Sequence, residues 1–186
     1  KMLMVGERAI GGITLLAEQA KAMGAPPHWL AYVSVEDVDA TLVQVAELGG
    51  TVYVPATDIP EVGRFGIFAD PTGAVLAAFT SANDSPGRDG DPQPGDITWN
   101  ELMSTDPEAS WTFYSTLFGW TVVSTMESPM GPYHMYGQGE DMYGGYMKAP
   151  DGAPSHWLYY AKVQGSAQAA CDRITKAGGE VLMGPM

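Results

Sequence analysis

Hydrophobic and polar residues alternate along residues 97–103, which predicts a β-strand. One face of this strand carries Ile97, Trp99, Glu101 and Met103. Apolar residues then recur at helical spacing, which predicts a helix that ends before Gly119. Thr105 is expected to cap this helix, with Pro107 in its first turn. Three more strands are predicted in the glycine-separated segments 121–126, 133–136 and 142–147.

The same order of elements is predicted earlier in the chain. A strand at 29–35 precedes a helix at 37–48, and three strands follow at 51–55, 64–69 and 74–79. The turn between the last two reads Asp-Pro-Thr-Gly, where proline presets the bend and glycine tolerates a positive φ. Both stretches therefore predict a βαβββ unit, and the fold class is α+β.

Part of the sequence occurs twice. Residues 24–57 are echoed by residues 152–186, and a shorter echo relates Gly6–Gly12 to Gly139–Gly145. Copies so far apart indicate a duplicated domain. We expect a first domain at 1–80, a Ser, Gly, Pro and Asp-rich linker at 81–96 and a second domain at 97–186, each domain incomplete at its outer end. The glycine pairs within the shorter echo predict bulges or close backbone approaches.

Composition narrows the classes of function. The chain has 186 residues, of which 9 are basic and 22 acidic, so its formal charge of −13 disfavours nucleic acid as a partner. Apolar runs are too short to span a membrane, and the single cysteine, Cys171, excludes an internal disulfide. We therefore expect a cytoplasmic protein without a membrane partner.

The motifs W-N-E-L-M-S-T-D-P-E-A and D-P-T-G-A, set within paired βαβββ units, resemble the vicinal oxygen chelate superfamily. The chain is similar to its tandem-domain glyoxalase/bleomycin resistance/dioxygenase-like members. This resemblance implies that each domain is a pair of curved mixed sheets around a cleft. It also implies that active members hold a divalent metal such as Zn, Ni or Fe there, on His, Glu or Gln ligands, to polarise substrate oxygens.

The residues that match the ligand positions of active members lack donor atoms for a metal. The first-strand position is occupied by Leu30, Trp99 and Leu158, and a last-strand position by Ala77. We therefore expect no metal cofactor. A shifted site on Glu101 and His156 stays open as an alternative, although two ligands hold such metals poorly.

Glu101 is the most informative polar residue. A carboxylate facing the cleft is costly to bury without a partner, so we expect it to pair with Arg or a backbone donor, or to contact a ligand. For His28 and His156, a hydrogen bond to the backbone at the strand entry is an alternative to a functional role. Aromatic and methionine residues are concentrated in residues 99–147, and most of them are expected to be core.

Three hypotheses follow. The first is a metal-independent protein that binds a small organic molecule, cationic or aromatic, in an aromatic cleft. The second is a metal-dependent lyase of the lactoylglutathione lyase type, an isomerase or a dioxygenase with displaced ligands. The third is a non-catalytic scaffold that forms a homodimer. The residues expected to line the binding site are Glu101, Trp99, Met103, His156, Tyr160, Leu158, His28 and Tyr32.

Overall fold

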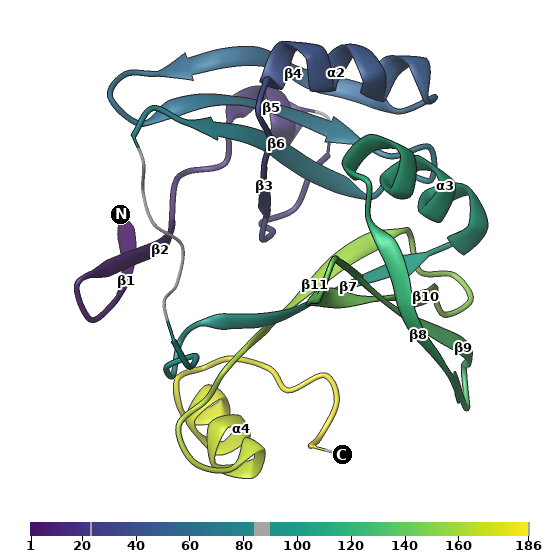
Figure 1. Cartoon of the computed structure of the whole chain (residues 1–186). Coiled ribbons are helices and arrows are strands. Elements are labelled where there is room, and N and C mark those ends of the chain that lie inside the picture. Colours follow the sequence, from purple (N-terminus) through teal and green to yellow (C-terminus); the bar gives the residue numbers. More distant parts are fainter. Residues whose placement is uncertain (23, 84–89, 186) are drawn as a thin grey trace.

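The computed structural model describes residues 1–22, 24–83 and 90–185, and it has the expected α+β architecture. Residues 84–89, within the predicted linker, and Met186, at the end of the predicted repeat, lie outside the described residues. The described strands form three sheets of two, five and four strands (Figure 1). None of the described helices is long and apolar enough to cross a membrane.

The four-stranded sheet is a complete βαβββ unit with strand order β3-β6-β5-β4. Its elements are β3 (Tyr32–Ser34), α2 (Val38–Glu47), β4 (Thr51–Ile59), β5 (Gly63–Ala69) and β6 (Val75–Ser81). Strands β3 and β6 are parallel, and the other neighbours are antiparallel. Helix α2 covers one face of this sheet, where it buries Val38, Leu42 and Val45.

The five-stranded sheet has the same unit with one strand added, in the order β11-β7-β10-β9-β8. Its elements are β7 (Ile97–Ser104), α3 (Pro107–Phe118), β8 (Thr121–Ser128), β9 (Gly131–Gln138), β10 (Asp141–Lys148) and β11 (His156–Ala161). The parallel pair β7·β10 matches β3·β6, so the two units share one topology. Strand β11 pairs antiparallel with the free edge of β7.

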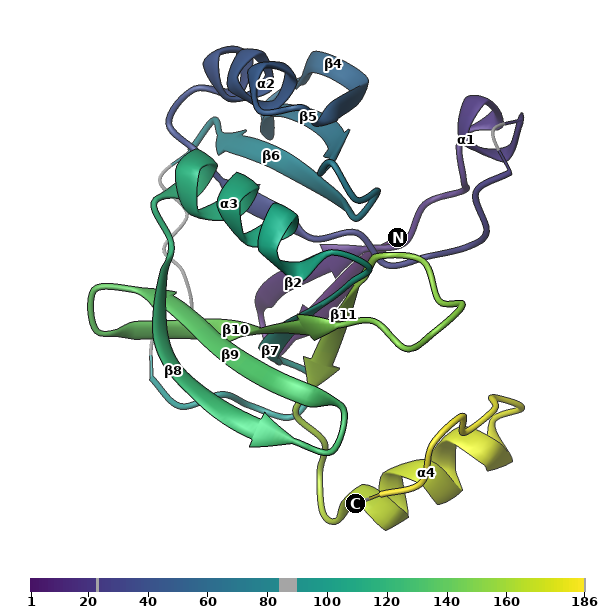
Figure 2. The same ribbon diagram turned by 90° about the vertical axis from the view of Figure 1, so that its right-hand side faces the viewer.

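The remaining elements lie outside these two sheets. Strands β1 (Met2–Val5) and β2 (Arg8–Gly12) form a hairpin, and α1 (Glu18–Ala22) is a short helix. Helix α4 (Ala167–Lys176) follows β11 and is capped by Ser166. Figure 2 shows α4 at a distance from both sheets. Arg8 pairs with the buried Asp96, which joins the hairpin to the start of β7.

Two sequence predictions about local structure are wrong. Helix α3 is capped by Asp106 and not by Thr105, because the Asp106 carboxylate accepts a hydrogen bond from the Ala109 N–H. The predicted strand 29–35 is only three residues long. Strand β3 lies at a sheet edge, whereas the equivalent β7 is paired on both sides and extends over eight residues. His28 consequently precedes its strand, whereas His156 begins β11.

Helix α3 lies between the two sheets and joins them into one core (Figure 2). Phe68 of β5 and Phe113 of α3 are both buried, with ring centroids 6.1 Å apart. A buried polar cluster crosses the same junction: the Ser110 hydroxyl donates to Asp70 Oδ2 at 3.0 Å and lies 2.8 Å from the Ser104 hydroxyl. Burial of these polar groups is tolerated because each has a partner.

Candidate functional site

The face of the five-stranded sheet opposite α3 brings together six of the eight predicted site residues. Residues paired across neighbouring strands point to the same face. Leu158 pairs with Glu101, Tyr160 with Trp99, and His156 with Met103, so β7 and β11 contribute three residues each. We call the set Trp99, Glu101, Met103, His156, Leu158 and Tyr160, together with Tyr133 of β9, the Glu101 face.

Glu101 is buried, with 7% of its surface exposed, and both of its oxygens are hydrogen-bonded. The Tyr133 hydroxyl donates to Oε2 at 2.9 Å, and the Tyr160 hydroxyl donates to Oε1 at 3.0 Å. No Lys, Arg or His among the described residues forms a salt bridge with this carboxylate. We expected Arg or a backbone N–H to pair with Glu101. The donors are instead the hydroxyls of two tyrosines.

Tyr133 reaches Glu101 across the intervening strand β10, and two neighbours make that possible. The Trp99 indole N–H donates to the Tyr133 oxygen at 2.8 Å and fixes the ring. Gly145 of β10 lies directly beneath this ring, and a Cβ at that position would collide with the Tyr133 hydroxyl. The glycine pair predicted to allow a close approach therefore does so, and it opens the path between Tyr133 and Glu101.

The phenols of this face stay protonated near neutral pH. Burial raises the pKa of Tyr160 to about 12, and the adjacent Glu101 charge adds to the effect. Burial also raises the pKa of Tyr133, and Glu101 reinforces this shift while the Trp99 hydrogen bond opposes it. Both groups therefore act as hydrogen-bond donors to the carboxylate, and neither is suited to release a proton.

The two histidines form backbone hydrogen bonds at their strand entries. His28 Nδ1 lies 2.7 Å from the Pro26 oxygen, and His156 Nδ1 lies 2.8 Å from the Pro154 oxygen. The backbone hydrogen bonds expected at the strand entries are therefore present for both residues. His156 remains beside Met103 on the Glu101 face, whereas His28 does not belong to that face.

Tyr32 also lies apart from the Glu101 face. It is on β3 of the four-stranded sheet, where its ring contacts Phe65 and Phe79. Tyr32 is the counterpart of Glu101, because each lies equally far in the sequence before the aspartate, Asp37 or Asp106, that caps the helix of its unit. The two sheets thus place an aromatic group and a carboxylate at equivalent positions.

Several aromatic residues near Glu101 in the sequence belong to the core behind the sheet. Tyr136 and Tyr146 are buried on the α3 side, where Tyr146 stacks on Trp111 at 4.6 Å. Trp120 packs against Tyr136. Tyr133 belongs to the same aromatic-rich stretch of the sequence and was not among the predicted site residues. Two features of the sequence could have indicated its role. Alternation along β9 places Tyr133 on the Glu101 side of the sheet, and the glycine pair on β10 leaves room for its ring.

The described residues do not fit a metal centre of the kind that the sequence resemblance implies. The expected ligand positions carry Leu30, Trp99, Leu158 and Ala77. In the described ranges, no group of three His, Cys, Asp or Glu side chains could hold an ion. Of the two alternative ligands, Glu101 already accepts from two tyrosines, and His156, whose Nδ1 contacts a carbonyl, would supply at most one nitrogen, so the pair lacks the third ligand that such a metal needs.

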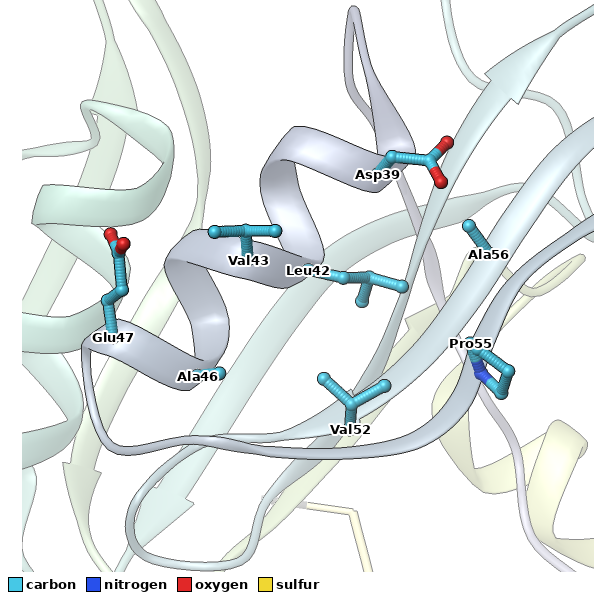
Figure 3. A pocket seen from close by; sticks show the side chains of 8 residues that line it. All are labelled: Asp39, Leu42, Val43, Ala46, Glu47, Val52, Pro55 and Ala56. Carbon is cyan, nitrogen blue, oxygen red and sulfur yellow. The ribbon is translucent and has the colours of Figure 1, made fainter.

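A shallow hollow of about 440 Å³ lies elsewhere, between α2 and β4 (Figure 3). Its apolar floor is flanked by the carboxylates of Asp39 and Glu47. Asp39 is already paired with Arg64 at 2.7 Å. The hollow is lined by none of the predicted site residues and by no aromatic side chain. The Glu101 face, in contrast, combines aromatic rings with a buried carboxylate.

Sequence comparison gives a consistent family and several relatives. Residues 6–77 match the family model described as "Glyoxalase/Bleomycin resistance protein/Dioxygenase superfamily". A Mycobacterium tuberculosis protein described as "Putative glyoxylase CFP32" is 37% identical over 164 residues, which cover 87% of this chain and 62% of that protein. The chain thus spans less than two thirds of this relative. The anthracycline biosynthesis protein DauV of Streptomyces sp. is 32% identical over 96 residues, covering 52% of this chain and 34% of that protein.

Solved structures show the same fold. The 2,2',3-trihydroxybiphenyl 1,2-dioxygenase of Sphingomonas wittichii superposes with a TM-score of 0.56 and 15% identity, covering 83% of this chain and 60% of that chain. The Mn(II)-bound glyoxalase of Novosphingobium aromaticivorans gives a TM-score of 0.52 and 16% identity, covering 79% and 50%. These superpositions show a shared architecture of curved mixed sheets. At identities this low they do not show a shared reaction, so function has to be argued from the residues of the site.

Proposed function

We propose that this chain, which belongs to the Glyoxalase/Bleomycin resistance protein/Dioxygenase superfamily, binds a small aromatic molecule with a cationic group on its Glu101 face. The observation that carries the proposal is the buried Glu101 carboxylate, held by two tyrosine hydroxyls and by no basic side chain among the described residues. A buried charge without a counter-ion favours a ligand that supplies one.

The hydrogen-bonding capacity of this group supports a donor on the ligand. A carboxylate accepts about four hydrogen bonds, and Glu101 receives two from the tyrosines. Tyr160 is 46% exposed, and its oxygen has lone pairs left while its proton points to Glu101. An ammonium group placed beside Tyr160 would therefore have two acceptors, the Tyr160 oxygen and the Glu101 carboxylate.

The surroundings of Glu101 favour an aromatic body on the same ligand. Trp99 and Tyr160 are paired across β7 and β11, and Leu158, which is 38% exposed, lies beside Glu101. Such side chains attract flat rings and organic cations through stacking and cation–π contacts. The relative named for anthracycline biosynthesis is compatible with an aromatic ligand, although its name describes that protein alone.

The proposed binding does not require a metal. The expected ligand positions offer no donor atoms, and the tyrosines that hold Glu101 have raised pKa values, which makes this group a poor proton-transfer system. The relative named as a glyoxylase and the dioxygenase neighbours share the fold. For this chain, the donor atoms of the described residues favour ligand binding over the lyase and dioxygenase alternatives.

Three indoles that differ in one group test the proposal. Tryptamine carries an ammonium, tryptophol a hydroxyl and indole-3-acetate a carboxylate. At pH 7 we expect the melting temperature to rise most with tryptamine, less with tryptophol and not at all with indole-3-acetate. The preference for tryptamine over tryptophol should correspond to about tenfold or more in Kd, the size of a charge-assisted hydrogen bond.

Glu101→Gln is the decisive variant, and Glu127→Gln is its matched control on the exposed strand β8 of the same sheet. Loss of the tryptamine preference in Glu101→Gln, with the preference kept in Glu127→Gln, supports the proposal. Equal binding of all three indoles by the wild type, or an undiminished preference in Glu101→Gln, would overturn it. So would the absence of binding by any of them.

A further inference from the structure

Neighbouring residues on β11 point to opposite faces of the sheet and make different contacts. Tyr160 faces Glu101 and donates to it at 3.0 Å. Tyr159 faces the other way, and its oxygen accepts a hydrogen bond from the Ala31 N–H at 3.1 Å. Ala31 immediately precedes β3, so this bond joins β11 to the four-stranded sheet, 128 positions away in the sequence.

The Ala31 bond lies at a junction between two sheet edges. Strand β3 is the outer strand of its sheet, and β11 is the outer strand of the other. The Ala31 oxygen already accepts from the Ala77 N–H within the four-stranded sheet, at 2.9 Å. The Ala31 N–H, just before β3 begins, donates to the Tyr159 phenol, which therefore satisfies this backbone donor.

Strand β11 has a second anchor on the same side. The Trp157 indole N–H donates to the Tyr114 hydroxyl of α3 at 3.2 Å. Trp157 fixes the start of β11, whereas Tyr159 lies further along the strand, next to Tyr160. The regular pairing with β7 breaks between Tyr160 and Ala161, so Tyr160 occupies the last regular position of the strand.

Tyr160 is 46% exposed, so its own packing does little to hold it on Glu101. Its placement depends on the path of β11 at the point where the pairing ends. We infer that Tyr159 is a positioning residue for the Glu101 face: its bond to Ala31 holds the end of β11 so that the Tyr160 hydroxyl reaches Glu101. The role in ligand binding rests on the proposed function, whereas the placement of Tyr160 does not.

Tyr159→Phe removes the hydroxyl and keeps the ring. Tyr143→Phe is the matched control, because Tyr143 is on β10 of the same sheet and its hydroxyl makes no hydrogen bond with any described residue. Protein labelled with ¹³C at tyrosine Cζ gives one resonance per tyrosine, and this resonance responds to hydrogen bonding of the hydroxyl. Tyr160→Phe assigns the Tyr160 signal, and Glu101→Ala gives its position without the acceptor.

In Tyr159→Phe we expect the Tyr160 resonance to move toward its Glu101→Ala position while the Tyr133 resonance stays in place. Tyr143→Phe should leave both unchanged. Tryptamine should bind Tyr159→Phe roughly threefold to tenfold more weakly than wild type, the range for one neutral hydrogen bond. In Tyr143→Phe, tryptamine affinity should stay within about twofold of wild type.

An unmoved Tyr160 resonance in Tyr159→Phe would overturn the inference, whatever the affinity for tryptamine. A shift of the same size in Tyr143→Phe would also overturn it, because the effect would then belong to the sheet as a whole. If wild-type protein does not bind tryptamine, the proposed function fails, and the Tyr160 resonance still decides the role of Tyr159. The two claims are therefore tested separately.

Discussion

The Tyr133 hydroxyl donates to Glu101 Oε2 at 2.9 Å from a strand that is not its neighbour. Strand β10 separates β9 from β7, and the contact exists because β10 presents Gly145 at the crossing point. One missing side chain thus allows a phenol to cover a buried carboxylate. This hydrogen bond supplies one of the two donors to the Glu101 carboxylate, and a side chain at position 145 would disrupt it.

Replacing Gly145 with alanine should disrupt this crossing. Its Cβ would overlap the Tyr133 ring, and overpacking of this kind costs about 1–3 kcal/mol of unfolding free energy. Urea denaturation measures the loss. Gly12, the counterpart of Gly145 in the sequence echo, provides the control, since a Cβ there meets only the Lys1 oxygen at 3.7 Å. A cost for Gly145→Ala that persists in a Tyr133→Ala background would show that the ring is not the cause.

Glu101→Gln should lower stability despite removing a buried charge. The amide can accept only on its oxygen, so one tyrosine hydroxyl loses its acceptor. We expect a loss of about 1–3 kcal/mol, measured by urea denaturation. Glu127→Gln, on an exposed strand, should change stability by less than about 0.5 kcal/mol. A Glu101→Gln protein more stable than wild type would mean that the tyrosines do not compensate the buried carboxylate.

The junction between the sheets should depend on Ser110. This buried hydroxyl donates to Asp70 and contacts Ser104, so Ser110→Ala leaves a buried carboxylate oxygen without that donor. The expected loss of unfolding free energy is about 1–3 kcal/mol. Ser115→Ala, on the same helix but bonded only to a helical carbonyl at 3.3 Å, should be close to neutral. Equal effects of the two changes would contradict a specific role for the cluster.

Stability should fall at alkaline pH. The pKa of Tyr159 and that of Tyr160 are each raised to about 12 from an ordinary value of 10.0, for both mainly by burial. A raised pKa means that the folded state favours the protonated phenol, so its contribution is complete below pH 10 and is lost as pH rises toward 12. Urea denaturation at pH 8, 10 and 11 measures this. The decline above pH 10 should be smaller in Tyr159→Phe, and an identical decline would count against the assignment.

Sequence patterns predicted the two βαβββ units because strand alternation, helix spacing and the Asp-Pro-Thr-Gly turn are local signals. They also placed Glu101 and five other site residues on one face, since parity along β7 and β11 follows from alternation. Tyr133 was not assigned to the site because its reach across β10 depends on tertiary register. The Tyr159 contact with Ala31 was equally inaccessible, because it joins two sheets that no local pattern relates.

His28 and Tyr32, which were also predicted to line the binding site, lie apart from the Glu101 face. In the sequence echo, His28 corresponds to His156 and Tyr32 to Tyr160. The structure places Tyr32 in the other sheet with Phe65 and Phe79, at the position equivalent to Glu101. Duplication preserved the fold, whereas the chemistry of the two faces differs. The predicted domain boundaries and the predicted homodimer stay predictions.

The most direct test of the central claim is an experimental structure of the protein with tryptamine. We expect the ammonium about 3 Å from a Glu101 or Tyr160 oxygen, with the indole ring against Trp99 or Tyr160. Tryptamine bound in the hollow between α2 and β4, or beside Tyr32, with the Glu101 face unchanged, would show that the Glu101 face is not the binding site.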